Sequence, residues 1–341
     1  MPAAPLTPRY AATAAFAPMV LFALAGSDAI GRAVAGHLGI DLAAHEEREF
    51  EDGEHKARSL ARVAGADVYV LHSLHGGPQA STDDKLCRLL FFLAAVKDAG
   101  AARVTAVLPY LCYARKDRRT KPNDPVTTRY VAALFEAVGT DTVVALEVHN
   151  ESAFENAFRC RSVALSAAPP LVQKVLPLLG DEPLCVVSPD LGGGKRADLF
   201  REALQAVIGR PVGNAFAEKH RSAGVVSGEL FVGDVQGATC IIVDDLISTG
   251  GTLVRARRAA REAGGRGGIA CVGPGLVMAG AAAAHADPAI ERIITTDSVP
   301  PFRLPVGAVR EKLHTADAAP LLGEAIRRLH AGEALTDLMA F

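Results

Sequence analysis

The sequence predicts an α/β protein with two successive domains, each built on a mainly parallel sheet flanked by helices. Short apolar runs rich in β-branched residues alternate with amphipathic helical patterns along almost the whole chain. Both faces of these runs are apolar, which is typical of strands buried in a parallel sheet. With 341 residues, the chain is long enough for two domains with separate cores.

The first half contains four predicted strands with helices between them. Ser27 or Asp28 can cap the first helix, and Gly100 ends the second. The predicted strands are Val20–Ala25, Asp67–Leu71, Val104–Leu108 and Thr142–Val148. Three helices are predicted between them. The first ends near His37, the second runs from the Ser81–Asp83 region to about Val96, and the third runs from about Thr127 to Val138.

The second half repeats this rhythm after a change of composition around Ser166–Pro170, where the residues become small and proline appears. We place the domain junction there, which gives a first domain at 19–165 and a second at 166–341. The last helix can pack back onto the first domain. The predicted strands are Leu184–Val187, Val212–Phe216, Cys240–Val243, Ile269–Val272 and Ile293–Thr295, and the predicted helices are Leu171–Leu179, Ala197–Ile208 and Asp317–His330.

The most informative stretch is T-C-I-I-V-D-D-L-I-S-T-G-G-T-L at residues 239–253. An apolar strand ends in the adjacent acids Asp244 and Asp245, and small residues then open a helix. Backbone N–H groups at such a helix start favour a phosphate, and glycine lets the backbone approach it closely. Carboxylates at a strand end can accept hydrogen bonds from sugar hydroxyls or hold a hydrated Mg²⁺. Together these features indicate ribose 5-phosphate; the alternative is a plain strand–turn–helix with an acidic first turn.

Two further groups of polar residues follow predicted strands. Arg115, Lys116 and Asp117 lie on a long basic loop bounded by prolines. This loop suits a polyphosphate, but it also fits a solvated surface loop. His149 and Asp190 each follow a strand and can share a Mg²⁺ ion, although a single histidine is more often structural.

Lys219 and Arg221 form another candidate pair, between a predicted strand and a glycine-containing stretch. Two cations on a mobile loop can close over a transferring phosphoryl group and stabilise the charge that develops in the transition state. The alternative is a charged surface turn.

Composition excludes several classes of partner and location. A net charge of -2 gives no reason to expect nucleic acid or a membrane surface, and no apolar stretch is long enough for a membrane span. None of the six cysteines forms a C-x-x-C pair, which favours reduced thiols in a cytoplasmic protein. Residues 1–18 are rich in alanine and proline and lack the pattern of a signal peptide, so we expect a disordered tail.

Six segments, in order, resemble the ribose-phosphate diphosphokinase (phosphoribosyl pyrophosphate synthetase) family. They are F-E-D-G-E at 50–54, P-Y-L-C-Y-A-R-K-D-R-R at 109–119, E-V-H-N at 147–150, S-P-D-L-G-G-G-K-R-A at 188–197, E-K-H-R at 218–221 and V-D-D-L-I-S-T-G-G-T at 243–252. One such match is modest evidence, but six in the family's order identify the chain as a divergent member. The resemblance extends from about Val20 to Leu338.

The resemblance implies two tandem phosphoribosyltransferase-type domains, with ATP on the first and ribose 5-phosphate on the second. It implies the Mg²⁺-dependent transfer of the diphosphoryl group of ATP to the anomeric hydroxyl of ribose 5-phosphate, giving 5-phosphoribosyl 1-diphosphate and AMP for nucleotide biosynthesis. It also implies a homo-oligomer built from dimers, with a hexamer as one option, because a neighbouring subunit can supply part of the ATP site.

The family's functional residues can be carried over onto matching positions. The resemblance implies that Lys219 and Arg221 stabilise the transition state, and that His149 and Asp190 hold the metal. The implied ATP contacts are Phe50, Asp52, Glu54, Arg115, Lys116, Asp117 and His149. The implied ribose 5-phosphate contacts are Asp190, Asp244, Asp245, Ser248, Thr249, Gly250, Gly251 and Thr252.

Some positions depart from the family pattern. Glu147 and Ser248 each stand where the family has aspartate, Lys116 replaces a glutamine, and His220 replaces an arginine. These departures mean that the family's control by ADP and phosphate cannot be assumed. Two other functions compete with the synthetase reading. One is a phosphoribosyltransferase, which would not need the ATP segments, and the other is a non-catalytic regulatory relative, which would not need to retain His149, Lys219 and Arg221.

Overall fold

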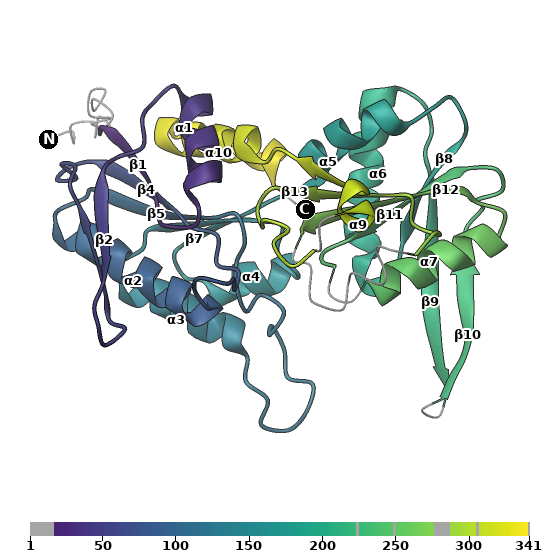
Figure 1. Ribbon diagram of the computed structural model, residues 1–341, viewed down its shortest axis with the longest axis horizontal. Helices are drawn as coiled ribbons and strands as arrows, with labels where there is room; N and C mark the ends of the chain where they lie inside the picture. Colours follow the sequence, from purple (N-terminus) through teal and green to yellow (C-terminus); the bar gives the residue numbers. More distant parts are fainter. Residues whose placement is uncertain (1–16, 223–224, 248–249, 276–286, 305–306, 340–341) are drawn as a thin grey trace, which may run out of the picture.

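The computed structural model describes residues 17–222, 225–247, 250–275, 287–304 and 307–339, and it contains two sheets that lie in successive halves of the chain (Figure 1). Strands alternate with helices in both halves, and helices cover both sheets. The predicted α/β class with mainly parallel sheets is therefore confirmed. The expected disordered tail lies almost entirely outside the described residues.

The first sheet is parallel throughout, and its strands lie in the order β1-β4-β5-β6-β7. All residues of β4 and β6 are buried, because helices cover both faces of the sheet. Its strands are β1 (Met19–Ala23), β4 (Asp67–Leu71), β5 (Arg103–Leu108), β6 (Thr142–Leu146) and β7 (Arg161–Leu165). The helices α1 (Asp28–Leu38) and α10 (Ala319–Ala331) cover one face, and α2 (Thr82–Asp98), α3 (Thr127–Ala137) and α4 (Glu151–Ala157) cover the other.

The second sheet has the order β10-β9-β8-β11-β12-β13-β14 and is parallel except for the β9–β10 pair. Its strands are β8 (Leu184–Ser188), β9 (Gly213–Ser222), β10 (Val225–Val232), β11 (Thr239–Asp244), β12 (Arg266–Pro274), β13 (Arg292–Thr296) and β14 (Leu313–Ala316). The helices α5 (Ala168–Val175) and α6 (Gly194–Ile208) pack on one face and α7 (Gly251–Glu262) packs on the other, while the short α9 (Ala308–Glu311) lies beside β14.

One apolar cluster runs through both halves of the molecule. It includes Leu171 and Phe200 from the helices on the second sheet, and Leu322 and Ile326 from α10. Figure 1 shows α10 leaving the second half and returning beside α1 of the first. The two sheets are thus held together by shared core contacts as well as by the chain that connects them.

Local sequence signals account for several helix boundaries. The hydroxyl of Ser81 accepts a hydrogen bond from the backbone N–H of Asp84, while the Asp84 carboxylate accepts one from the N–H of Ser81. This reciprocal pair caps α2, as the sequence predicts. Gly39 adopts a left-handed conformation immediately after α1, which ends that helix.

One local prediction was wrong. The strand predicted at Val212–Phe216 continues to Ser222 and pairs with β10, so Lys219 and Arg221 lie in a strand and not in a loop. Figure 1 shows β9 and β10 extending beyond the rest of the sheet as a two-stranded ribbon. After Phe216 β9 no longer pairs with β8, and a strand that leaves the packed sheet need not alternate between apolar and polar residues. The charged E-K-H-R segment therefore gave no strand signal.

A second hairpin was also missed. The charged stretch at residues 46–54 forms most of β2 (His45–Glu49) and the turn that leads into β3 (His55–Ser59). The two strands pair antiparallel.

In the described part of the chain, no helix is both long enough and apolar enough to span a membrane.

Candidate functional site

The two halves meet at a histidine and an aspartate. His149 lies three residues after β6 of the first sheet, and Asp245 directly follows β11 of the second. Nδ1 of His149 lies within hydrogen-bond distance of Oδ2 of Asp245. Both strands present their carboxyl ends here, where ligands bind in open α/β sheets. This contact joins the predicted ATP side to the predicted ribose side.

The adjacent acids at the end of β11 do not share one electrostatic environment. Burial raises the pKa of Asp244, and the neighbouring charge of Asp245 raises it further. Burial also opposes ionisation of Asp245, but the hydrogen bond from His149 and the charge of Arg196 lower the pKa of Asp245 below its usual value. The site therefore places a readily ionised carboxylate, Asp245, beside a buried carboxyl group, Asp244, whose ionisation burial opposes.

The predicted phosphate loop is only partly described. Ser248 and Thr249 lie outside the described residues. Gly250 adopts a left-handed conformation (φ 74°) at the start of α7, and among the described residues no side chain caps this helix. Gly251 and Thr252 form its first turn, and Thr252 Oγ1 accepts a hydrogen bond from Arg255 at 3.3 Å. The first backbone N–H groups of a helix are not bonded within the helix and favour an anion.

The basic loop lines two cavities beside His149. One, of about 150 Å³, is lined mainly by charged and polar residues: Arg115, Lys116, Asp117, Arg118, Thr120, Asp124, Pro125 and His149. The other, of about 240 Å³, has more apolar walls: Tyr110, Leu111, Tyr113, Ala114, Arg115, Glu147, His149, Asp245, Leu246 and Pro274. Arg115 and His149 line both. The structure therefore brings the predicted residues Arg115, Lys116 and Asp117 to His149.

Phe50, Asp52 and Glu54 are not brought to these cavities. They lie at the turn of the β2–β3 hairpin, where the backbone N–H of Phe50 donates to the carbonyl of Glu54 at 2.8 Å. The Phe50 ring is exposed, and the guanidinium carbon of Arg48 lies 5.0 Å from its centroid. Figure 1 places this hairpin at the outer side of the first half, away from α4, which begins two residues after His149.

Asp190 does not contact His149 through any hydrogen bond that the structure shows. Its Oδ1 accepts the backbone N–H of Gly193 at 2.8 Å, which caps the short turn before α6. Within the described ranges, no three His, Cys, Asp or Glu side chains are grouped as a metal-binding cluster.

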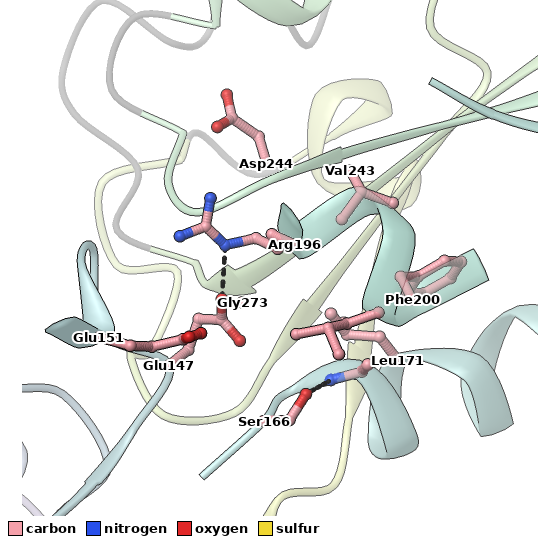
Figure 2. A pocket seen from close by; sticks show the side chains of 11 residues that line it. Glu147, Glu151, Ser166, Leu171, Arg196, Phe200, Val243, Asp244 and Gly273 are labelled. Atoms are coloured by element: carbon pink, nitrogen blue, oxygen red, sulfur yellow. Dashed lines mark hydrogen bonds and ion pairs between the residues drawn. The ribbon is translucent and has the colours of Figure 1, made fainter. Parts of the chain in front are cut away.

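Three residues near the site were not among the predicted site residues: Glu147, Arg196 and Asn150. Figure 2 shows Arg196 reaching from α6 toward Glu147, with Asp244 on its other side. Asn150 Nδ2 donates to Asp117 Oδ2 at 2.8 Å. Their motifs were recognised, but nothing in a linear sequence tells which side chains inside a motif meet across two domains.

Comparisons with known proteins match both halves of the chain. A family model described as the N-terminal domain of ribose phosphate pyrophosphokinase matches residues 19–139, and one described as the phosphoribosyl synthetase-associated domain matches residues 226–340. A ribose-phosphate pyrophosphokinase of Caldanaerobacter subterraneus is 36% identical over 89% of this chain and 92% of its own. The one from Aquifex aeolicus is 34% identical over 89% and 94%.

A solved structure gives the same result. The crystal structure of phosphoribosylpyrophosphate synthetase from Mycobacterium smegmatis superposes with a TM-score of 0.80 and 30% sequence identity. The match covers 92% of this chain and 99% of that chain. The similarity therefore includes both sheets and the connection between them.

Proposed function

The chain belongs to the ribose-phosphate pyrophosphokinase family, and on that premise we propose that the residues around His149 carry out the family's reaction. The enzyme transfers the diphosphoryl group of ATP to the anomeric hydroxyl of ribose 5-phosphate. The anomeric oxygen attacks the β-phosphorus, the bond from that phosphorus to the α–β bridging oxygen breaks, and AMP leaves. The hydroxyl proton is lost to solvent. The products are 5-phosphoribosyl 1-diphosphate and AMP.

The observation that carries this assignment is the contact between His149 and Asp245. Through this contact, the cavities lined by the basic loop lie next to the two acids at the end of β11. In our proposal Arg115, Lys116 and Asp117 face the triphosphate. Guanidinium and ammonium groups suit phosphate oxygens, because they offer charge together with several N–H donors.

The ribose 5-phosphate side rests on the end of β11 and the start of α7. Asp244 and Asp245 are proposed to accept hydrogen bonds from the ribose hydroxyls. Ser248, Thr249, Gly250, Gly251 and Thr252 are proposed to hold the 5-phosphate, which the N-terminus of α7 favours. This arrangement anchors the sugar at its phosphate and leaves the anomeric hydroxyl free to approach ATP.

Mg²⁺ fits the donor set of the site. Asp244 is a buried carboxyl group beside the carboxylate of Asp245, so the site offers two oxygen donors side by side. Mg²⁺ prefers oxygen ligands, keeps several waters and usually takes only one or two carboxylates together with substrate phosphates. When bound, it neutralises charge on the phosphate oxygens. We propose that His149 and Asp190 hold it, directly or through water.

Lys219 and Arg221 are proposed to stabilise the transition state from the β9–β10 ribbon. Charge accumulates on the transferred diphosphoryl group as the reaction proceeds, and cations that meet it only then lower the barrier. Both residues lie in the part of β9 after Phe216, which pairs with β10 and no longer with β8.

We also propose that the active enzyme is a homo-oligomer of dimers, with a hexamer as one form. Phe50, Asp52 and Glu54 line neither cavity near His149 of their own chain. The exposed Phe50 ring can instead stack on the adenine of ATP in a neighbouring subunit. A cytoplasmic location is proposed on the cysteines, all six of which are free thiols.

One assay separates this function from its two rivals. Purified protein is incubated with ATP, ribose 5-phosphate and Mg²⁺, and both AMP and 5-phosphoribosyl 1-diphosphate are measured. We expect the two products in equal amounts. A phosphoribosyltransferase would consume 5-phosphoribosyl 1-diphosphate without making AMP. A regulatory relative would make neither, and absence of AMP over a range of phosphate concentrations would refute the proposal.

Subunit sharing has its own test. Phe50→Ala and Lys219→Ala variants, each weakly active alone, are mixed under conditions that allow subunits to exchange. If one site uses Phe50 from one chain and Lys219 from another, mixed oligomers contain some intact sites and regain activity. Mixing that restores nothing, although the subunits have exchanged, would show that each site is built from a single chain.

A further inference from the structure

A buried ion pair joins the two halves of the molecule next to His149. Glu147 directly follows β6, and Arg196 lies in the first turn of α6. Nε of Arg196 donates to Oε1 of Glu147 at 2.5 Å (Figure 2). Only 9% of the Glu147 side chain and 17% of the Arg196 side chain are exposed. Water therefore screens this pair little.

The same guanidinium also holds the backbone that carries His149. Nη2 of Arg196 lies 3.4 Å from the carbonyl oxygen of Val148 and 3.3 Å from that of His149. On the other side, Oε2 of Glu147 accepts the backbone N–H of Ala167 at 3.0 Å. The strand end that presents His149 is thus held from the second half of the chain.

The backbone at Glu147 shows how tightly this arrangement is specified. Glu147 has a φ of 49°, in the left-handed region that side chains other than glycine rarely adopt. A Cβ atom at Gly273 in β12 would lie 2.5 Å from Cγ of Glu147, so position 273 has no room for a side chain. Conformations of this kind are strained and persist only where the surrounding contacts determine them.

We propose that Glu147 and Arg196 are positioning residues for the reaction. They hold the backbone of His149 so that its imidazole meets Asp245, and they thereby fix the nucleotide cavities relative to the ribose acids. The inference rests on the proposed function of His149. It assigns neither residue a contact with the reacting atoms, although Glu147 also lines the larger cavity.

A neighbouring ion pair offers a matched control. Nζ of Lys195 lies 3.1 Å from Oε2 of Glu151, so this pair also crosses between the two halves. Its lysine side chain is 61% exposed. Lys195 has no hydrogen bond to the backbone of the His149 segment among those the structure shows. Removing Lys195 therefore deletes an interdomain ion pair without releasing His149.

The test compares Glu147→Gln, Arg196→Lys and Lys195→Met by steady-state kinetics. We expect Glu147→Gln to lower kcat on the order of tenfold or more, with smaller changes in both KM values, because displaced reacting groups slow the chemical step. Arg196→Lys keeps a positive charge beside Glu147 but cannot reach both carbonyls. We therefore expect its kcat to lie between those of Glu147→Gln and Lys195→Met. Lys195→Met should stay within about twofold of the parent. A kcat for Glu147→Gln equal to that of Lys195→Met would overturn the inference.

A second measurement needs no turnover. Nitrogen-15 NMR of the His149 ring, assigned with a His149→Asn variant, reports its contact with Asp245 at one fixed pH. We expect the ring signals to shift in Glu147→Gln and to stay in place in Lys195→Met. If the parent protein makes no AMP but this shift occurs, the proposed function fails and the positioning role stands. Unchanged ring signals in Glu147→Gln would overturn the positioning role.

Discussion

The side-chain amide of Asn150 donates to Asp117 at 2.8 Å, which ties the residue after His149 to the basic loop. The amide oxygen of Asn150 also accepts the backbone N–H of Ala153 at 3.1 Å and so caps α4. One side chain therefore performs two tasks.

Replacing Asn150 can separate these two tasks. Serine still caps a helix but is too short to reach Asp117, so Asn150→Ser should raise the KM for ATP a few-fold, roughly 1 kcal/mol of lost loop positioning. It should leave the KM for ribose 5-phosphate and the melting temperature nearly unchanged. Initial rates at saturating ribose 5-phosphate measure this effect. If only Asn150→Ala raises the KM, the cap and not the loop contact is responsible.

Replacing Lys219 should lower kcat and leave the binding of ATP nearly unchanged. We expect Lys219→Ala to lower kcat by at least about a hundredfold while the KM for ATP changes far less, because its charge is proposed to meet the substrate mainly in the transition state. Lys219→Arg keeps a positive charge at this point of β9 and serves as control. A variant whose main defect is a raised KM for ATP would place Lys219 in ground-state binding.

The sequence predicts those parts of the site that are local in the chain. Asp244, Asp245 and the glycines after them form one strand–loop–helix unit, so their types and spacing alone indicate a phosphate and a diol. The pairing of Glu147 with Arg196 spans 49 residues and two domains. It depends on how the two sheets are packed, and no local pattern encodes that packing.

The two hairpins show a second reason why sequence reasoning fails. Strands are found through apolar alternation, which arises only where one face of a sheet is buried. In the β2–β3 hairpin the half-buried face is formed largely by polar side chains such as His45, Glu47 and His55, and after Phe216 the strand β9 pairs with β10 and no longer with β8. Their missing signal reflects their surroundings, and ribbons of this kind are available for ligands or neighbouring subunits.

Asp67 anchors the returning helix α10 to the first sheet. Its carboxylate accepts from Arg103 Nε, Tyr69 Oη and His330 Nδ1, each at 2.8 Å. Asp67→Asn cannot accept all of these bonds, and we expect a loss of roughly 1–3 kcal/mol in the free energy of unfolding at neutral pH, measured with urea. Asp141→Asn, at a more exposed ion pair with Lys97, should lose less.

The contribution of Asp67 should also depend on pH. Although burial opposes ionisation, hydrogen bonds from Arg103, His330 and Tyr69 lower the pKa of Asp67 below its usual value. A carboxylate with a lowered folded-state pKa adds stability above its unfolded-state pKa, near 4, and loses it as pH falls further. The difference between parent and Asp67→Asn should therefore shrink below about pH 4. A constant difference would contradict this origin.

The contact between α1 and α10 should tolerate no side chain at Gly323. A Cβ atom there would lie 2.6 Å from Cδ2 of His37. We expect Gly323→Ala to cost on the order of 1–3 kcal/mol, through overpacking. Gly36→Ala in α1 is the matched control, because no atom lies within 4 Å of its added Cβ. Alanine favours a helix, so Gly36→Ala should stabilise by up to about 1 kcal/mol, as read from thermal unfolding.

Lys85 supplies a pH dependence of the opposite kind. Its side chain is 7% exposed, and Nζ donates to the carbonyl of Ser73 at 3.2 Å and to Nε2 of His75 at 3.3 Å. In the described parts of the chain its ammonium pairs with no carboxylate, and burial lowers its pKa to about 8. Between that value and the ordinary 10.5, the folded protein releases a proton that the unfolded chain keeps.

Stability should therefore rise with pH in this window, because the unfolded state binds more protons. We expect the free energy of unfolding of the parent to increase relative to that of Lys85→Met between about pH 7 and about pH 10. Lys195→Met, at an exposed lysine, corrects for the loss of one positive charge. Urea unfolding at several pH values measures the difference. If the two variants follow the same curve relative to the parent, Lys85 is not titrating as a buried amine.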